Sequence, residues 1–211
     1  MRILAISDIH QKIDNLKAIL SKVKNESLDL ILVAGDITNY GDRGDAAKCF
    51  ELLDFTRVMA VPGNLDSNAV LSFLEEKGFS LHNKKITFND FEFCGFGGGL
   101  IGKTGEILFS ELEIEKKLKQ LVSKDSIFLT HLPPKDTPID LAEDEHIGSA
   151  AVKKMIIERG PLLHICGHAH DSAGKIKIGK TVCVNVASVK EGYATKIEIK
   201  DKEIYLKRIS L

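Results

Sequence analysis

Residues 2–10 read RILAISDIH, an aliphatic run that stops at a carboxylate and an imidazole. The same form recurs twice downstream, as LILVAGD in residues 30–36 and as RVMAVPGN in residues 57–64. Between these runs, apolar residues recur near helical spacing over 16–23 and 46–53. Alternating strands and helices of this kind are typical of a sheet covered on both faces. The beginning of the chain is therefore predicted to be α/β.

The rest of the chain adds more strands than helices. Short β-type runs are predicted over 81–82, 85–88 and 91–96, followed by a glycine-rich loop. Helices are predicted over 111–122 and 149–158, with a strand over 126–130 between them. The tail is predicted to be all β, over 162–166, 175–178, 181–186, 193–199 and 203–209. Since no long linker divides the chain, we expect one domain over 1–211 with two stacked sheets.

Charge and composition exclude several classes of protein. Lys and Arg number 29 against 30 Asp and Glu, so the formal charge of −1 argues against a nucleic-acid binder, which needs a basic excess. The N-terminal apolar run is too short for a signal peptide, and no apolar run approaches the roughly 20 residues that span a bilayer. We therefore expect a cytoplasmic protein without a membrane segment. The four cysteines, which form no C-x-x-C pair, are expected to be reduced core residues.

Residues able to bind metals fall just past the ends of predicted strands. Taken singly, an Asp after a strand is usually a turn or helix cap, and a single His is usually structural. Here, however, five strand ends carry such residues, and strand ends at one sheet edge are where sites of α/β proteins are built. We therefore expect one site there. Its residues are Asp8, His10, Asp36, Asn64, His131, His168 and His170.

The order D-x-H, G-D, G-N, H and G-H-x-H resembles the signature of the calcineurin-like metallophosphoesterases. The resemblance implies an α/β fold of two stacked mixed sheets flanked by helices, a four-layer αββα sandwich. Carried over residue by residue, one metal would be held by Asp8, His10, Asp36 and His170, and the other by Asp36, Asn64, His131 and His168. Imidazole and carboxylate ligands without thiolate suit Mn, Fe, Ni, Zn or Co. Two divalent transition-metal ions are thus the expected cofactors, with Asp36 bridging them.

Such a metal pair lowers the pKa of a bound water towards about 7, so that a bridging hydroxide attacks phosphorus and no side-chain nucleophile is required. The segment Gly35-Asp36-Ile37-Thr38-Asn39-Tyr40-Gly41 is similar to G-D-[LI]-T-x-x-G of cyclic-nucleotide-type phosphodiesterases. It does not match the G-D-x-V-D-R-G of protein phosphatases. A phosphodiesterase acting on a small or nucleotide-like phosphoester is therefore the leading hypothesis, ahead of a phosphomonoesterase.

One position departs from the family pattern. Many members carry G-N-H-[DE], whose His is a proposed acid for the leaving oxygen, whereas this chain has Leu65 there. His146 is the candidate substitute acid or phosphate contact, because it precedes a predicted helix whose N-terminal N–H groups, with Ser149, could bind an anion. An exposed loop residue is the alternative reading of His146. Asp66 is predicted to be a helix cap or a partner of the metal ligands.

Two further points stay open at this level. The run Gly97-Gly98-Gly99 fits either a backbone nest for phosphate or a tight turn after a strand. Because of Leu65, the second hypothesis for function is a metal-binding scaffold or interaction protein with weakened catalysis. A nuclease would need a basic groove that the net charge does not indicate. The expected partner is a small phosphoester, and neither the oligomeric state nor the native metal follows from the sequence.

Overall fold

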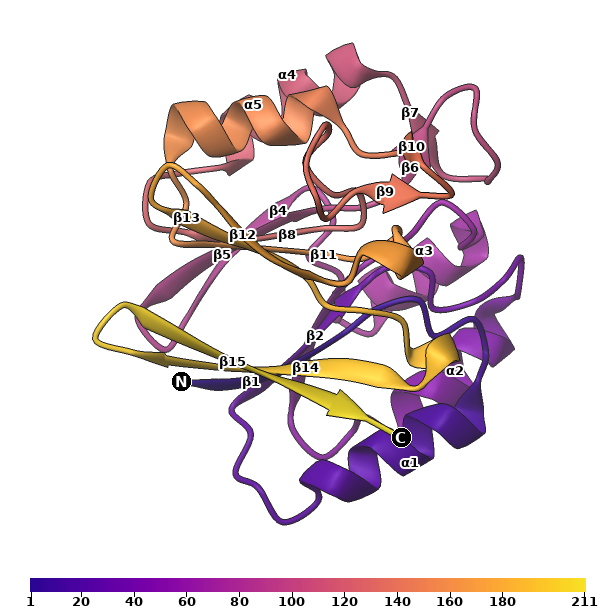
Figure 1. Ribbon diagram of the computed structural model, residues 1–211. Helices are drawn as coiled ribbons and strands as arrows, with labels where there is room; N and C mark the ends of the chain where they lie inside the picture. Colours follow the sequence, from indigo (N-terminus) through magenta and orange to yellow (C-terminus); the bar gives the residue numbers. More distant parts are fainter.

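Two β-sheets lie face to face between two layers of helices in the computed structural model, which describes residues 1–211 (Figure 1). The first sheet has the order β15-β14-β1-β2-β3 and the second has the order β12-β13-β11-β8-β5-β4. The strands of the first sheet are β1 (Arg2–Ile6), β2 (Leu30–Ala34), β3 (Arg57–Val61), β14 (Tyr193–Lys200) and β15 (Glu203–Ser210). Those of the second are β4 (Lys84–Phe88), β5 (Phe91–Phe96), β8 (Ile127–Thr130), β11 (Leu163–Cys166), β12 (Gly174–Ile178) and β13 (Thr181–Asn185).

Helices cover the outer face of each sheet (Figure 1). The first sheet carries α1 (Ile13–Val23), α2 (Arg43–Glu51) and α3 (Asn68–Glu76), and the second carries α4 (Glu111–Leu121) and α5 (Ala150–Arg159). Short elements complete the chain: β6 (Gly99–Leu100), β7 (Leu108–Phe109), β9 (Leu141–Ala142), β10 (Glu145–His146), and the 3₁₀ turns η1 (His170–Ser172) and η2 (Val189–Glu191). The four-layer αββα prediction is confirmed.

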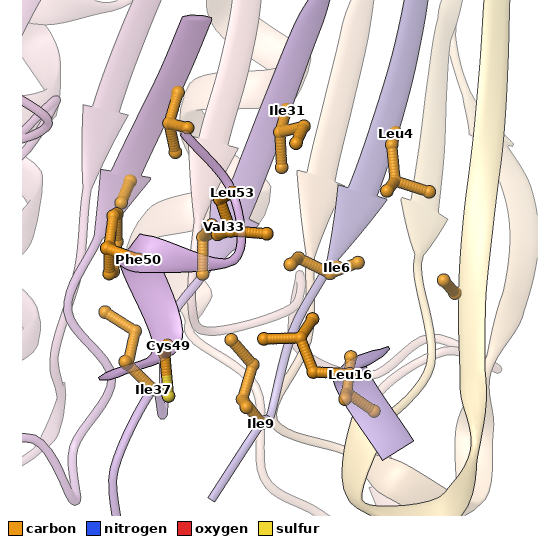
Figure 2. Packing of buried hydrophobic residues seen from close by; sticks show 14 of the residues in the cluster. Leu4, Ile6, Ile9, Leu16, Ile31, Val33, Ile37, Cys49, Phe50 and Leu53 are labelled. Atoms are coloured by element: carbon orange, nitrogen blue, oxygen red, sulfur yellow. The ribbon is translucent and has the colours of Figure 1, made fainter. Parts of the chain in front are cut away.

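Three apolar cores hold the four layers together. Along β1, Leu4 and Ile6 face the helices while Ile3 faces the second sheet, as the two-residue repeat of a strand requires. Figure 2 shows the core under the first sheet, where residues of α1 and α2 such as Leu16 and Phe50 pack on β1 and β2. Because both faces of each central strand are covered, these strands consist almost entirely of aliphatic residues.

Parallel pairing places many strand ends at one edge. β1, β2 and β3 run parallel in the first sheet, and β5, β8, β11 and β13 run parallel in the second. The carboxyl ends of these strands therefore lie at one edge of each sheet, and these two edges lie side by side. Antiparallel strands β4 and β12 form the edges of the second sheet, and β14 and β15 extend the first.

Three helices differ from the sequence prediction, and the first of them, α1, begins at Ile13 rather than residue 16. α2 begins at Arg43 rather than residue 46, because Asp42 forms a capping box with Asp45 and accepts the Gly44 amide at 2.7 Å. α3 was not predicted as a helix; Ser67, and not Asp66, caps its N-terminus. The helix-cap reading of Asp66 is therefore wrong. None of the helices combines the length and the apolar character that a bilayer crossing requires.

The glycine run serves close packing. Gly99 packs against the loop that follows β3, where a Cβ on Gly99 would come within 2.6 Å of the Asn64 Cβ. A Cβ on Gly97 would collide with the Pro62 carbonyl of the same loop. The Gly97 amide donates to His82 Nδ1 at 3.0 Å. The run therefore lets one loop pack directly against another, and a free backbone nest is not formed at Gly97.

The N-terminus of α5 is closed by a carboxylate from α4. Glu111 accepts the Ala150 amide at 2.8 Å, the Ala151 amide at 2.9 Å and the Ser149 hydroxyl at 2.7 Å. These are the donors that the sequence offered as an anion site beside His146. Because all three already donate to Glu111, they are not free to bind an anion.

Glu111→Ala is expected to lower the free energy of unfolding by about 1–2 kcal/mol, in the upper part of the range of about 0.5–2 kcal/mol for lost helix caps. The reason is that three donors at the start of α5 lose their acceptor. Urea unfolding of the protein in EDTA measures the effect, with Glu75→Ala, an exposed glutamate of α3, as the control. Equal stability of both variants would show that water replaces the carboxylate without cost.

Candidate metal centre

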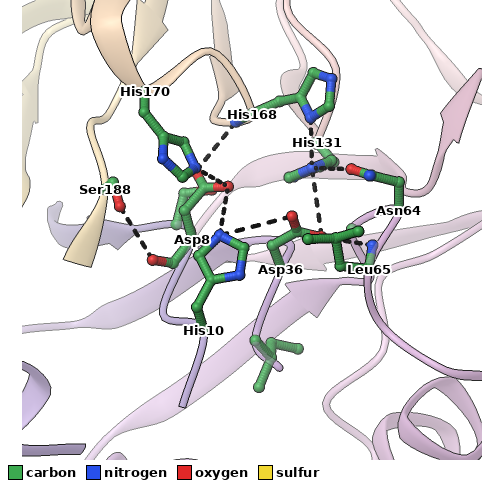
Figure 3. A network of polar contacts seen from close by, with 12 residues as sticks. Asp8, His10, Asp36, Asn64, Leu65, His131, His168, His170 and Ser188 are labelled. Atoms are coloured by element: carbon green, nitrogen blue, oxygen red, sulfur yellow. Dashed lines mark hydrogen bonds and ion pairs between the residues drawn. The ribbon is translucent and has the colours of Figure 1, made fainter. Parts of the chain in front are cut away.

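The polar residues at the strand ends converge on one point between the sheets (Figure 3). Asp8, Asp36 and Asn64 follow β1, β2 and β3 of the first sheet. The second sheet supplies His131 after β8, and His168 and His170 after β11. His10 completes the group from the loop before α1. The structure thus brings together all seven of the residues that the sequence assigned to metal binding.

One half of the centre surrounds Asp8. Its Oδ1 lies 3.1 Å from His170 Nε2 and 3.8 Å from His10 Nε2. His10 Nε2 is also 3.8 Å from Asp36 Oδ2. The buried Asp8 Oδ1 and His10 Nε2 have no hydrogen-bond partner of proper geometry. Unpartnered polar atoms of this kind in a buried cluster fit the ligands of a cation.

The other half surrounds His131, which is fully buried. Its Nδ1 lies 2.8 Å from the Ala34 carbonyl and must donate to it, so its Nε2 carries a lone pair. That lone pair faces Asn64 Oδ1 at 3.0 Å, Asp36 Oδ1 at 3.6 Å and His168 Nδ1 at 3.1 Å. The Asn64 amide is oriented by donation of its Nδ2 to the Thr104 carbonyl at 2.7 Å, so that its oxygen is the atom facing His131.

Asp36 connects the two halves, because Oδ2 points to His10 and Oδ1 points to His131. In one half the lone pairs of Asn64 Oδ1, Asp36 Oδ1 and His131 Nε2 therefore face one another. In the other half, the oxygen and nitrogen donor atoms of Asp8, His10 and His170 converge. A divalent cation in each half would satisfy them, and the nitrogen and oxygen donors fit the borderline divalent metals. The donor atoms of Asp8, His10 and His170, and those of Asp8, Asp36 and His131, form two groups close enough to share an ion.

Burial and mutual repulsion set the charges in the centre. Burial lowers the pKa of His10 to about 4 and that of His168 to about 3, which keeps both imidazoles neutral and ready to bind metal. Burial also raises the pKa of Asp36, aided by the charges of Asp8 and Asp66. The pKa of Asp8 is lowered although burial acts to raise it, because His170 contacts the carboxylate. Without a cation, two adjacent carboxylates are hard to ionise together.

Comparison with known proteins decides the family. The sequence profile described as calcineurin-like phosphoesterase matches residues 1–172. The chain belongs to the calcineurin-like phosphoesterases. Members of this family hydrolyse phosphoesters with divalent metals, and the seven converging residues are the candidate ligands in this chain.

One curated relative is similar in sequence, and solved structures are similar in fold. An uncharacterized protein of Methanocaldococcus jannaschii is 33% identical over 196 residues, covering 88% of this chain and 87% of its own. A dimetal phosphatase from Danio rerio shares the fold with a TM-score of 0.71 at 14% identity, covering 100% of this chain and 96% of its own. An archaeal phosphodiesterase is similar with a TM-score of 0.57 at 14% identity, covering 99% of this chain and 100% of its own.

The backbone of this calcineurin-like centre is strained at its candidate ligands. Asp8, His10, Asp36 and His168 have φ of 52°, 45°, 48° and 68°, a left-handed conformation that costs energy for residues other than glycine. Hydrogen bonds hold it in place: the Asp8 amide donates to the Gly35 carbonyl at 2.9 Å, and the His168 amide donates to Asp8 Oδ2 at 3.1 Å. Strain of this kind, supported from several sides, is characteristic of functional sites.

Asp66 supports two of the ligand-bearing loops at once. Its fully buried carboxylate accepts the Gly63 amide at 2.8 Å, the Thr38 amide at 2.8 Å, the Thr38 hydroxyl at 2.9 Å and the Ile37 amide at 3.1 Å. These donors flank Asp36 on one loop and Asn64 on the other. Asp66 thus supports the two loops that carry Asp36 and Asn64. This agrees with the second interpretation of Asp66 in the sequence analysis, a partner of the candidate ligands.

Glu191 is a contact that the sequence analysis did not single out. Its Oε1 lies 3.1 Å from His170 Nδ1, and donation from Nδ1 would leave Nε2 of His170 free to bind a metal. The turn η2 that carries Glu191 is fixed to the first strand end, where the Lys190 amide donates to the Asp8 carbonyl at 3.0 Å. Glu191 lies in no motif, and only the fold brings it to His170.

His146 is placed at the margin of the centre. Its Nδ1 lies 2.7 Å from Asp140 Oδ1, and 39% of its side chain is exposed. The next residue, Ile147, lines the two clefts that open beside the candidate ligands. His82 and His164 make structural contacts away from the candidate ligands: His164 Nε2 lies 2.8 Å from the Thr130 hydroxyl, and His82 Nδ1 accepts a hydrogen bond from the Gly97 amide.

Addition of Mn²⁺ to EDTA-treated protein is expected to raise the melting temperature by about 5–10 °C. A ligand at 100 times its Kd stabilises the folded state by roughly 2.7 kcal/mol, and each kcal/mol shifts Tm by roughly 2–4 °C at this chain length. Differential scanning calorimetry with Mn, Ni, Zn and Mg measures the shift. Mg is expected to give the smallest shift because imidazole ligands suit it poorly. An unchanged Tm with every ion would argue against a metal centre.

Proposed function

We propose that this protein is a metal-dependent phosphodiesterase that hydrolyses a small or nucleotide-like phosphoester. Asp8, His10, Asp36 and His170 are proposed to hold one divalent ion, and Asp36, Asn64, His131 and His168 the other. The observation that carries the proposal is the position of the Asp36 carboxylate, which directs one oxygen towards each of two groups of opposed lone pairs. We also infer that residues 1–211 form a single metallophosphoesterase domain.

When bound, a pair of divalent ions supplies Lewis acidity towards phosphate and a water of lowered pKa. The chain's own residues supply the rest. The neutral imidazoles and the two carboxylates leave a bound ion pair with surplus positive charge, which attracts an anionic ester. The four cysteines are all buried, and burial raises the pKa of Cys49, Cys94 and Cys183 to about 12, so none of these three thiols is a competing nucleophile.

Leu65 bears on the kind of ester. The Leu65 amide donates to Asp36 Oδ1 at 2.9 Å, so the Leu65 backbone helps to position this candidate ligand. The Leu65 side chain cannot act as a proton donor for the leaving oxygen. Esters with an acidic leaving group need no proton donor, and such esters are the expected substrates. The preference for diesters over monoesters rests on the similarity of the Gly35–Gly41 segment to cyclic-nucleotide-type phosphodiesterases.

The direct test is hydrolysis of bis-p-nitrophenyl phosphate beside p-nitrophenyl phosphate. Metal-stripped protein would be resupplied with Mn, Ni, Zn, Co or Mg, and the bound metal counted by mass spectrometry. We expect metal-dependent turnover that is faster for the diester. Two bound ions per chain without turnover of either ester would instead favour the metal-binding scaffold, and faster turnover of the monoester would reject the diester preference.

Leu65→His is expected to raise kcat for poor leaving groups by about tenfold, less than the roughly 10²–10⁴-fold of an optimised general acid, because the surroundings of position 65 are not arranged for one. The increase should be larger for a phenyl ester than for the matching p-nitrophenyl ester, since only the former needs a proton. Leu65→Gln, similarly polar but without a useful acid, is the control. Equal gains on both esters, or none, would show that position 65 does not reach the leaving oxygen.

A further inference from the structure

Two clefts open on either side of the candidate centre, and Ile147 and His168 line both. The first, called here the lysine cleft, reaches Asn64 and has a volume of about 210 Å³. Its other walls are formed by Gly99, Leu100, Lys103, Thr104 and Leu132. The second, called here the acidic cleft, reaches His170. It is walled by Ala142, Glu143, Glu145, Asp171 and Glu191.

The charges of the two clefts are opposite. Lys103 is the one charged residue that lines the lysine cleft, whereas four acidic residues and no Lys or Arg line the acidic cleft. A phosphoester is an anion, so the acidic cleft repels both the phosphate and any second negative group on the substrate. The lysine cleft attracts the phosphate, and its aliphatic walls suit an uncharged organic group.

The loop that carries Lys103 is fixed to a candidate ligand. Asn64 donates through Nδ2 to the Thr104 carbonyl at 2.7 Å, and the Glu106 amide donates to the Asn64 carbonyl at 2.8 Å. Gly105 packs so closely that a Cβ there would come within 2.5 Å of the Asn64 carbonyl oxygen. The three residues that follow Lys103 in the sequence therefore hold its backbone beside Asn64.

The ammonium of Lys103 has only a weak partner. Its Nζ lies 3.9 Å from Oε2 of Glu145, a residue that lines the acidic cleft, and the two side chains are 59% and 76% exposed. An exposed ion pair at that distance contributes little. A phosphate oxygen entering the lysine cleft can therefore take the place of Glu145.

We propose that Lys103 is a substrate-binding and specificity-determining residue of this centre. Its ammonium contacts the phosphate of the ester, and Leu100, Leu132 and Ile147 enclose a compact uncharged group of the same substrate. The carboxylates of the acidic cleft disfavour substrates with more negative charge. The substrate class is thus a singly charged phosphodiester with a small neutral substituent, a statement that rests on the proposed function.

Lys103→Met is expected to raise KM for bis-p-nitrophenyl phosphate about tenfold, and Lys103→Glu about a hundredfold. In both, kcat should stay within about threefold, because binding lost equally from substrate and transition state appears in KM. The metal content should be unchanged, since Lys103 holds no ion. Lys207→Met, an exposed lysine on β15, is the matched control and should behave as wild type. Glu143→Gln should raise kcat/KM for p-nitrophenyl phosphate, a dianion, about threefold relative to the diester.

A second readout does not depend on turnover. Binding of inorganic phosphate to the metal-loaded protein, measured by calorimetry, should weaken about tenfold in Lys103→Met and remain unchanged in Lys207→Met. If wild type hydrolyses the diester and Lys103→Met alters neither KM nor phosphate binding, the role of Lys103 is overturned while the proposed function stands. If wild type hydrolyses nothing, the proposed function fails, and phosphate binding alone supports or overturns the role of Lys103 in holding an anion.

Discussion

Asp36→Asn is expected to abolish metal-dependent hydrolysis while leaving the metal-free protein at least as stable as wild type. The loss of kcat should be on the order of 10³-fold or more, because removal of even one positioned donor in an active site costs roughly 10²–10³. Asp36 provides an oxygen to each half of the centre, and an amide can direct an oxygen to only one.

Stability should move in the opposite direction. Burial and the charges of Asp8 and Asp66 raise the pKa of Asp36, so its ionised form is unfavourable without a cation. The amide removes that charge, and its oxygen can still accept the Leu65 amide that lies 2.9 Å from Asp36 Oδ1. The metal-induced rise in Tm should shrink accordingly.

Measurements of kcat, bound metal and Tm in EDTA on the same preparation separate these effects. Asp54→Asn, at an exposed position beyond α2, is the control for removing one negative charge. A variant that keeps both its metals and its activity would exclude Asp36 as the bridge. A variant that is inactive because it no longer folds would instead contradict the expected stability.

Asp66→Ala is expected to lower the free energy of unfolding by more than about 3 kcal/mol and to weaken metal binding at the same time. Four donors lose their only side-chain acceptor, and each buried donor left unsatisfied costs roughly 1–3 kcal/mol. Relief of the repulsion between Asp66 and Asp36 offsets only part of that loss.

Metal titration shows whether the effect reaches the centre. Loss of a group that positions a ligand typically reduces metal affinity about 10–100-fold. Asp66→Asn is the matched comparison, since it keeps the shape but replaces one acceptor by a donor that faces an amide. It should fall between wild type and Asp66→Ala. Full stability of Asp66→Ala would show that the loops after β2 and β3 hold their shape without this carboxylate.

The sequence predicted the strands of the centre well because their signals are local. β2 and β3 lie where the aliphatic runs lie, since strands buried on both faces require such runs. The seven residues that converge on the centre were singled out for the same reason, because they lie just past the ends of such runs; their role as metal ligands stays a prediction. Parallel pairing then brings these ends together without further information.

Other features depend on contacts between distant segments and left no local signal. β9 and β10 are two residues each and pair within a stretch that reads as a polar loop. The carboxylate of Glu111 caps the N-terminus of a helix that begins 39 residues later in the sequence. Glu191 contacts His170 only because the fold brings the two residues together. α3 was not predicted, because Ser67, the residue that caps its N-terminus, comes directly after the loop that follows β3.

The division of the centre between the two sheets has a consequence for biosynthesis. β1 is an inner strand of the first sheet, yet its neighbour β14 follows every strand of the second sheet in sequence, and His168 and His170 are synthesised only after β11. A nascent chain that ends before β11 carries Asp8, Asp36 and Asn64 but lacks two of the four histidines. If the proposed function holds, the complete set of candidate metal ligands exists only once β11 and the residues after it have been synthesised. We therefore expect binding of a metal pair to accompany closure of the first sheet rather than to guide the folding of its first half.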